Sequence, residues 1–585
     1  MVQTSKKIQG AILIIAKLIS SFLAVLIMSA MCSAADKQSA SSEEKGLPVA
    51  VQEKADIEYM LGYDNEMHGK WEEAMTNYSN ALKNDPSSAY LKTQVGRMLV
   101  KLDRLPEAIT MMEEILKKDP DYIPAMMYLA ELYNSQKKVD DAIGIYQRVL
   151  KLQPEKTEAL LSIGVLYASK QDFEKAQGLF KEVLKRDSDN LMALYYLGTV
   201  FVERKKYDAA EEQFKKLIEL NPNFDAAYLN MGLISEIKGH GKEAEDYYKK
   251  ALELNPQNIF VRERLAQVYI SDKSYDKAVK ELEEIAKNIP NVDIHLKLGM
   301  LYLQEREYDK AVSEFRIVTA AKPDDIPSRY YLALSLDELE HYDEAIDELK
   351  KILSLDPKNL NAFLNLAFIY TKKNQLTDAA KVYEEILTFD QGKPEIFSQL
   401  GNIYVQMKDY KKAGEVLSKG LQLFKDNDDL YFTIAVLYEK TDRFDDMVAA
   451  LNNAIRINPK HADALNYLGY SYADKGIHLK EALSLIQRAY DLKPDSGYIL
   501  DSLGWVYYKL GKYQEALKYL NNAIQSVNDD PVLFEHIGDV NEAMGNDKAA
   551  LDAWEKSLKY HEKEEGVKER VEEKIKKLGS KRKSK

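Results

Sequence analysis

The sequence is almost without cysteine, since Cys32 is the only one among 585 residues. One thiol per chain provides no disulfide framework, so stability must come from packing alone. Histidine is scarce as well, and the eight histidines form no pair at the spacing of a metal site. We therefore expect neither a metal site nor a cofactor in this chain.

Positive charge is also in deficit. The chain has 81 Lys and Arg residues against 94 Asp and Glu residues, a formal net charge of −13. Residues 1–35 hold three lysines and no acidic residue, so their removal would take the charge from −13 to −16. An acidic surface repels the phosphate backbone, which disfavours binding of DNA or RNA.

A 34-residue period fills most of the sequence. It gives fifteen repeats between Ala55 and Glu564, of which Ile259–Asn291 is one residue short and Ala462–Ser496 is one residue long. Position 8 of every repeat is glycine or alanine, and position 20 is alanine in every repeat except one, which has Met447. The hydrophobic spacing within a repeat predicts two antiparallel helices, with small residues where they approach closely.

Proline at position 32 predicts where the second helix of a repeat ends, because proline cannot donate a helical hydrogen bond. Ten repeats have it: Pro86, Pro120, Pro154, Pro222, Pro256, Pro290, Pro323, Pro357, Pro459 and Pro494. Five repeats have another residue there: Ser188, Gln391, Lys425, Asn528 and Glu562. These departures put only the individual turns in doubt.

The whole pattern resembles the tetratricopeptide repeat (TPR), with Leu-Gly at positions 7–8, Tyr at 11, Ala at 20, Phe or Tyr at 24 and Pro at 32. The resemblance covers residues 55–564, which are 510 of the 585 residues. It implies an all-α fold, a right-handed α-solenoid of about fifteen helix-turn-helix repeats whose concave face binds protein segments. A stack of this kind also explains the length without several globular domains.

Residues 1–35 have the layout of a secretory signal peptide. Lys6 and Lys7 precede an apolar stretch over residues 8–31, and the small residues Ser33, Ala34 and Ala35 follow. Two alternatives stay open: lipidation of Cys32 as in a bacterial lipoprotein, or retention of the segment as a membrane anchor. All three interpretations predict an exported protein, periplasmic or membrane-associated in a bacterial envelope.

The segments on either side of the array are short. Residues 36–54 are rich in Ser, Glu and Lys and predict a flexible linker. Residues 565–585 place Val567, Val571, Ile575 and Leu578 on one helical stripe, which predicts a capping helix followed by a basic tail. The tail could meet anionic lipid or an acidic partner. Neither flank is long enough for a catalytic domain, so we expect no enzyme.

Positions 2, 5, 9 and 12 of the first helix of each repeat face the concave side, an assignment implied by the family resemblance. Towards the end of the array these positions hold a cluster of aromatic, amide and acidic residues that suits an extended peptide. We predict a partner-binding groove from this cluster, which consists of Asn466, Tyr470, Tyr498, Asp501, Trp505 and Tyr508. The alternative is that these side chains pack against one another.

These features predict a non-catalytic protein–protein interaction scaffold of the bacterial cell envelope. Two alternatives remain at this point. The same tyrosine and tryptophan residues could bind an exported polysaccharide by stacking, or the array could be a structural spacer without a ligand. Because the sequence contains no signature of a particular partner, it does not choose between envelope processes.

Overall fold

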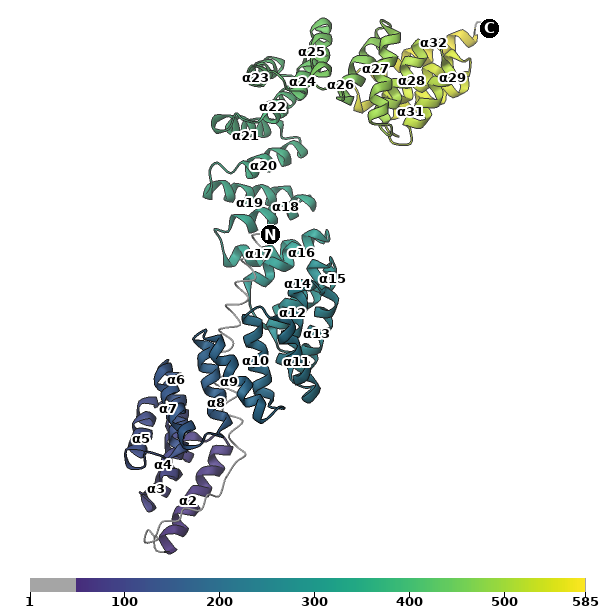
Figure 1. The fold of residues 1–585 in the computed structure, drawn as a ribbon. Coiled ribbons are helices and arrows are strands. Elements are labelled where there is room, and N and C mark those ends of the chain that lie inside the picture. Colours follow the sequence, from purple (N-terminus) through teal and green to yellow (C-terminus); the bar gives the residue numbers. More distant parts are fainter. Residues whose placement is uncertain (1–48, 584–585) are drawn as a thin grey trace. The chain divides into compact units, whose positions relative to one another are not determined.

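The computed structural model describes residues 49–583 (Figure 1). The predicted signal or anchor segment 1–35, Cys32 within it and most of the predicted linker lie outside the described residues. Within 49–583 the chain forms α-helices and one short 3-10 helix, and it has no strand. The predicted all-α class and the array of paired helices are confirmed.

The chain divides into two compact bodies at residues 290 and 291, which is the end of the short repeat. The helices of the N-terminal body (residues 49–290) are α2 Val49–Met67, α3 Trp71–Asn84, α4 Ala89–Lys101, α5 Leu105–Lys118, α6 Ile123–Ser135, α7 Val139–Leu152, α8 Thr157–Ser169, α9 Phe173–Arg186, α10 Leu191–Glu203, α11 Tyr207–Leu220, α12 Asp225–Ile237, α13 Gly241–Leu254, α14 Ile259–Ser271 and α15 Tyr275–Asn288.

The helices of the C-terminal body (residues 291–583) are α16 Val292–Gln304, α17 Tyr308–Ala321, α18 Ile326–Glu338, α19 Tyr342–Leu355, α20 Leu360–Lys372, α21 Leu376–Phe389, α22 Pro394–Gln406, α23 Tyr410–Leu423, α24 Asp428–Lys440, α25 Phe444–Ile457, α26 Ala462–Asp474, α27 Leu479–Leu492, α28 Gly497–Lys509, α29 Tyr513–Ala523, α30 Pro531–Ala543, α31 Asp547–Lys559, the 3-10 helix η2 His561–Lys563, and α32 Val567–Lys583.

The helix boundaries follow the repeat register. From α4 to α30, every first helix begins at position 1 and has 13 residues, as in α4, α16 and α28. The helix α2 is longer, with 19 residues from Val49. Residues 49–54, which we predicted as linker, are therefore part of this helix.

The small residues at positions 8 and 20 mark the closest approach within each helix pair. Every alanine at position 20 is fully buried, from Ala74 to Ala550. A Cβ atom added to Gly164 at position 8 would lie 2.5 Å from Cε1 of Phe180, the residue at position 24 of the same repeat. The large side chain at position 24 thus packs directly on the glycine backbone, so a larger residue at position 8 would force the two helices apart.

The turn between the two helices of a repeat has a left-handed residue at position 15. All fifteen repeats have a positive φ there, although only five of the residues are glycine and ten are not, such as Lys205 with φ 57°. The long repeat carries a second left-handed residue, His478 with φ 48°, just before α27. The extra residue of this repeat is thus accommodated in the turn, and the helices keep their length.

The C-terminal helix α32 covers the end of the last repeat. Its residues Val567, Val571 and Leu578 are buried in one cluster with Ala550 and Trp554 of α31, and Ile575 packs at the edge. These are the four residues of the predicted stripe. Between residues 49 and 583 the structure contains no helix with the length and apolar character needed to cross a membrane.

Candidate interaction surface on the first helices

The six predicted groove residues lie on two neighbouring first helices. Asn466 and Tyr470 belong to α26, and the other four belong to α28, which contacts α26. The structure therefore brings the predicted cluster together. What differs from the expectation is how many of these side chains are free to meet a partner.

Trp505 is covered by its own neighbours. Its side chain is only 7% exposed. The indole stacks on Tyr508 with ring centroids 4.9 Å apart and on His536 at 3.9 Å, and Lys509 Nζ lies 4.7 Å from its centroid. Trp505 Nε1 also donates a hydrogen bond to Asp474 Oδ1 at 3.3 Å. Trp505 therefore offers no open ring face in this structure, and its predicted contact with a partner stays a prediction.

His536 is the residue that organises this cluster, and sequence reasoning missed it. Its Nδ1 lies 2.8 Å from Asp501 Oδ1, and its ring is buried under Trp505. Burial alone would lower the pKa of His536, but the carboxylates of Asp501, Asp539 and Glu535 outweigh this effect and raise it. The imidazole thus keeps its proton to a higher pH than an ordinary histidine, and Asp501 is occupied by this pair.

The helix α32 covers acidic residues of α30, the first helix of the repeat that follows α28. Arg570 and Lys574 bind Glu535 at 2.9 and 2.7 Å, and Lys574 also binds Asp539 at 2.6 Å. Trp554 Nε1 donates to Asp539 Oδ1 at 3.1 Å. Burial alone would raise the pKa of Glu535, but the two cations outweigh it and lower the pKa. Glu535 and Asp539 are thus both paired with basic residues of α32.

A regular offset connects these pairs. Asp501 and His536, Glu535 and Arg570, and Asp539 and Lys574 are each 35 residues apart, one residue more than the repeat period. A residue at a given position of one first helix therefore contacts the residue at the next position of the first helix that follows. A search for complementary charges at this offset is the signal that would have found His536 in the sequence.

Of the six predicted residues, Tyr498 is the one that solvent reaches freely, with 66% of its surface exposed. Tyr470 is largely buried, which raises the pKa of its hydroxyl. The Asn466 Oδ1 atom is buried without a hydrogen-bond partner among the described residues. Of the predicted groove, only the Tyr498 side chain is thus largely exposed, and the other five residues are partly or fully buried.

Other exposed apolar side chains continue the surface within the C-terminal body. We call positions 2, 5, 9 and 12 of the first helices the first-helix face. Met300 and Phe368, both at position 9, are 46% and 51% exposed on this face, and Tyr498 stands at position 2. Lys372 lies 4.7 Å from the Phe368 ring centroid and pairs with Asp337 at 2.9 Å. In the N-terminal body, Tyr90 is similarly exposed at position 2.

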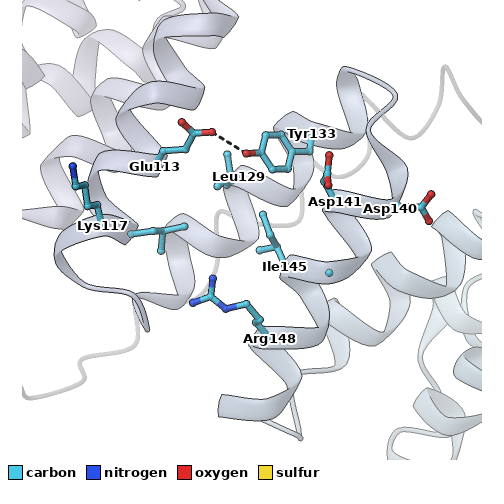
Figure 2. Close-up of a pocket in the computed structure, with 10 residues that line it drawn as sticks. Glu113, Lys117, Leu129, Tyr133, Asp140, Asp141, Ile145 and Arg148 are labelled. Carbon is cyan, nitrogen blue, oxygen red and sulfur yellow. Dashed lines mark hydrogen bonds between the residues drawn. The ribbon is translucent and has the colours of Figure 1, made fainter.

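A second candidate site is an open depression of about 500 Å³ that is lined by residues of α5, α6 and α7 (Figure 2). Acidic residues line one side and basic residues the other: Glu113, Asp140, Asp141, Lys117 and Arg148. Tyr133 donates to Glu113 at 2.8 Å, Arg148 donates to the Pro120 carbonyl at 2.9 Å, and Lys170 binds Asp140 at 2.6 Å. These polar groups connect consecutive repeats and form no nucleophile–base pair.

Three potential metal ligands meet between α24 and α26. The ligand atoms of Asp428, Asp429 and His461 lie within 4.8 Å of one another. However, His461 Nδ1 accepts the Ala464 amide proton at 3.2 Å as the N-cap of α26. The neutral ring then carries its own proton on Nε2, which lies 3.3 Å from Asp429 Oδ1. With no lone pair free in this state, His461 acts as a helix cap beside an acidic residue.

Comparison with known proteins gives four matching family models along the chain. Two are described as Tetratricopeptide repeat and match residues 59–123 and 238–293. The Cytochrome c-type biogenesis protein H TPR domain matches residues 114–228, and the Cilia and flagella-associated protein 70 C-terminal domain matches residues 330–544. Each model covers less than half of the chain.

Individual relatives are similar over limited parts. The TPR repeat-containing protein PA4667 of Pseudomonas aeruginosa is 38% identical over 121 residues, which are 21% of this chain and 20% of that protein. The match thus spans about a fifth of that relative. Among solved structures, YrrB, a TPR protein with an unusual peptide-binding site, is 21% identical over 32% of this chain and 96% of its own, with a TM-score of 0.29. The APC/C hetero-tetramer Cut9-Hcn1 is 15% identical over 84% of this chain and 97% of its own, with a TM-score of 0.34.

The repeat register, the paired helices and the family models agree along the array. The small residues at positions 8 and 20 are buried where the tetratricopeptide pattern requires them. Models of tetratricopeptide repeats match segments within residues 59–293, and the model over residues 330–544 is that of the Cilia and flagella-associated protein 70 C-terminal domain. The chain therefore contains tetratricopeptide repeats within an all-helical array of paired helices.

Proposed function

We propose that this protein is a non-catalytic scaffold of the bacterial cell envelope that binds segments of partner proteins along its first-helix face. Tetratricopeptide arrays are interaction scaffolds and typically lack catalytic sites, as the matched family models imply. The envelope location and the use of this particular surface are the parts that need a test.

One observation carries the choice of surface. Met300, Phe368 and Tyr498 are roughly half to two-thirds exposed on the first-helix face of the C-terminal body, whereas most large apolar residues of its first helices are buried. Aromatic and methionine side chains contribute much contact area for little loss of conformational entropy. Exposed anchors of this kind, surrounded by polar residues, suit a peptide segment of another protein.

The polysaccharide alternative depends mainly on Trp505, which is not accessible in this structure. A sugar ring needs an open aromatic face, and the indole of Trp505 is stacked within the chain and 7% exposed. Tyr508 shares that stack. Tyr498 alone is a small platform, so protein binding is the function that the surface supports best.

A matched pair of double variants tests the surface. We expect Phe368→Ala with Tyr498→Ala to abolish capture of envelope proteins by the tagged chain in crosslinked cells. The control removes two exposed leucines that lie outside the first-helix face, Leu355→Ala with Leu423→Ala, and should leave capture unchanged. Capture of no specific protein by the unmodified chain would favour the spacer. Equal loss in both variants would show that the first-helix face has no special role.

The envelope location rests on the sequence of residues 1–35 and has its own test. Alkaline phosphatase fused after Lys585 should be active in a bacterial host, because this enzyme folds only where disulfides form. Deletion of residues 1–35 should abolish the activity while the fusion is still produced. Activity that persists without these residues, or that is absent with them, would contradict export through this segment.

A further inference from the structure

The helix α2 carries an unusual amount of exposed apolar surface. Ile57, Met60, Leu61 and Met67 are between 49% and 68% exposed. With Tyr63, α2 holds five of the eighteen large hydrophobic residues that are exposed in residues 49–583, more than any other helix there. Exposure of so much apolar surface to water is unfavourable, so this surface of α2 is suited to contact with a partner.

The repeat register explains the shape of this face. Ile57 and Leu61 stand at positions 3 and 7 of the first repeat. In the second repeat the same positions hold Leu91 and Val95, which are buried, and α4 packs there on α3 of the preceding repeat. Because no described repeat precedes α2, its positions 3 and 7 form an end face that is shaped to pack against a helix.

Two pairs of residues on α2 are arranged symmetrically about Tyr59, whereas Met60 has Glu58 as its counterpart. Ile57 and Leu61 lie two residues to either side, and Lys54 and Asp64 lie five residues to either side. An antiparallel second copy of α2, related by a two-fold axis near residue 59, would set Ile57 opposite Leu61 and Lys54 opposite Asp64. The Asp64 side chain is largely exposed and can reach such a partner. Apolar and charged residues are thus complementary in the same arrangement.

The other end of the array lacks a comparable face. Val567, Val571 and Leu578 of α32 are buried on the last repeat, whereas the residues between them, such as Lys568 and Glu572, are exposed and charged. A head-to-tail contact would therefore press an apolar face on a charged helix. Contact between two identical N-terminal faces uses the same surface on both copies, so the assembly is complete as a dimer, which is the commonest form of homo-oligomer.

We infer that the protein forms a homodimer in which the α2 helices of two copies pack antiparallel through Lys54, Ile57, Met60, Leu61 and Asp64. This inference goes beyond the proposed function and does not depend on it. The dimer would double the number of first-helix faces in one assembly, which increases avidity for a partner with repeated segments.

Thiol crosslinking tests the two-fold axis. In the full chain with Cys32→Ser, the substitution Met60→Cys introduces the only thiol, one residue from the axis and at the edge of the contact, where a short bismaleimide can join the two copies. We expect this reagent to give a crosslinked dimer at micromolar concentration. The matched control is Thr110→Cys, an exposed position on α5 outside this face, which should stay monomeric. Adding Ile57→Glu and Leu61→Glu to Met60→Cys should abolish the crosslink.

Charge exchange tests the register. By analytical ultracentrifugation, Lys54→Glu or Asp64→Lys alone should weaken the dimer about three- to tenfold, and the two together should restore it. The inference is overturned if the unmodified chain is monomeric, or if Met60→Cys crosslinks no better than Thr110→Cys. It is also overturned if the thiol introduced by Met60→Cys is protected from maleimide in a monomer, because residues 1–48 would then cover α2.

Discussion

At the residue scale, position 15 of the repeat shows how the array tolerates strain. A non-glycine residue in the left-handed region costs about 1 kcal/mol or more, and ten of the fifteen repeats accept it. The turn is fixed by the helices on both sides, whose packing outweighs this local cost. Sequence reasoning did not find the feature, because residues such as Lys205 carry no sign of a positive φ.

The five glycines at position 15 allow a direct measurement of that cost. Gly511 has φ +72° and open space where a Cβ atom would be added, so Gly511→Ala changes only the backbone preference. We expect it to lower the opening free energy of α28 and α29 by about 1 kcal/mol in native-state hydrogen exchange. The control Gly144→Ala lies within α7 with equally open space and should raise the stability of its repeat. The same effect at both sites would contradict the argument.

Glu131 on α6 gives a pH-dependent prediction. Burial raises the pKa of this carboxyl to about 7, although Arg97 opposes the shift. The folded state therefore binds more protons than the unfolded state between pH 4.5 and 7, and stability falls as pH rises through this window. Glu131→Gln should remove the dependence and stabilise α6 by up to about 3 kcal/mol above pH 7.

Hydrogen exchange of the α6 amides at several pH values measures this effect. Glu158→Gln is the control, since that side chain on α8 is largely exposed and forms an ion pair with Lys156. We expect the control to leave the pH profile of α6 unchanged. A profile of Glu131→Gln that still falls between pH 4.5 and 7 would show that another group is responsible.

At the element scale, α32 is predicted to hold the last repeat closed. Val571 is fully buried against Trp554 and Ala550, so Val571→Asp places a carboxylate in an apolar cluster. We expect a loss of about 3 kcal/mol in the opening free energy of α30 to α32, with α26 much less affected, because each repeat interacts mainly with its neighbours.

The matched control on the same helix is Lys568→Asp. Lys568 is exposed and on the solvent side of α32, so this change also adds an acidic group but leaves the cluster intact. Hydrogen exchange should then show normal protection in α30 and α31. Similar losses in both variants would mean that charge on α32, and not burial of Val571, determines the closure.

The helices themselves were largely predictable, because periodic small residues mark both members of each pair. The start of α2 was not. We assigned residues 49–54 to a linker because residues 36–54 are rich in Ser, Glu and Lys, yet residues 49–54 are helical. The 34-residue period begins only at Ala55, so the repeat pattern gave no sign that the helix includes the residues before it.

The candidate site was less predictable than the fold. The pattern located the aromatic cluster on α26 and α28, but it assigned Trp505 to a partner when the ring is packed by His536 of the next repeat. Position within a repeat shows which face a residue is on. Exposure depends on the residue that the following repeat supplies, and that requires the 35-residue offset seen in the structure.

At the scale of the whole molecule, the two compact bodies predict two unfolding events. The division at residues 290 and 291 coincides with the repeat that lacks one residue, where the regular stacking period is interrupted. A repeat array with an interrupted period loses cooperativity at that point, because stability is a sum of repeat and interface terms. We therefore expect each body to open as its own cooperative unit.

Two equivalent phenylalanines, one in each body, provide the matched test. Phe214 and Phe315 are both fully buried at position 24 and pack on Gly198 and Gly299. Each substitution to alanine should cost about 3–5 kcal/mol. Hydrogen exchange should show that Phe214→Ala weakens protection only within residues 49–290, and Phe315→Ala only within 291–583. If either variant lowers protection in both bodies, the array unfolds as one unit, and the short repeat does not separate two cooperative blocks.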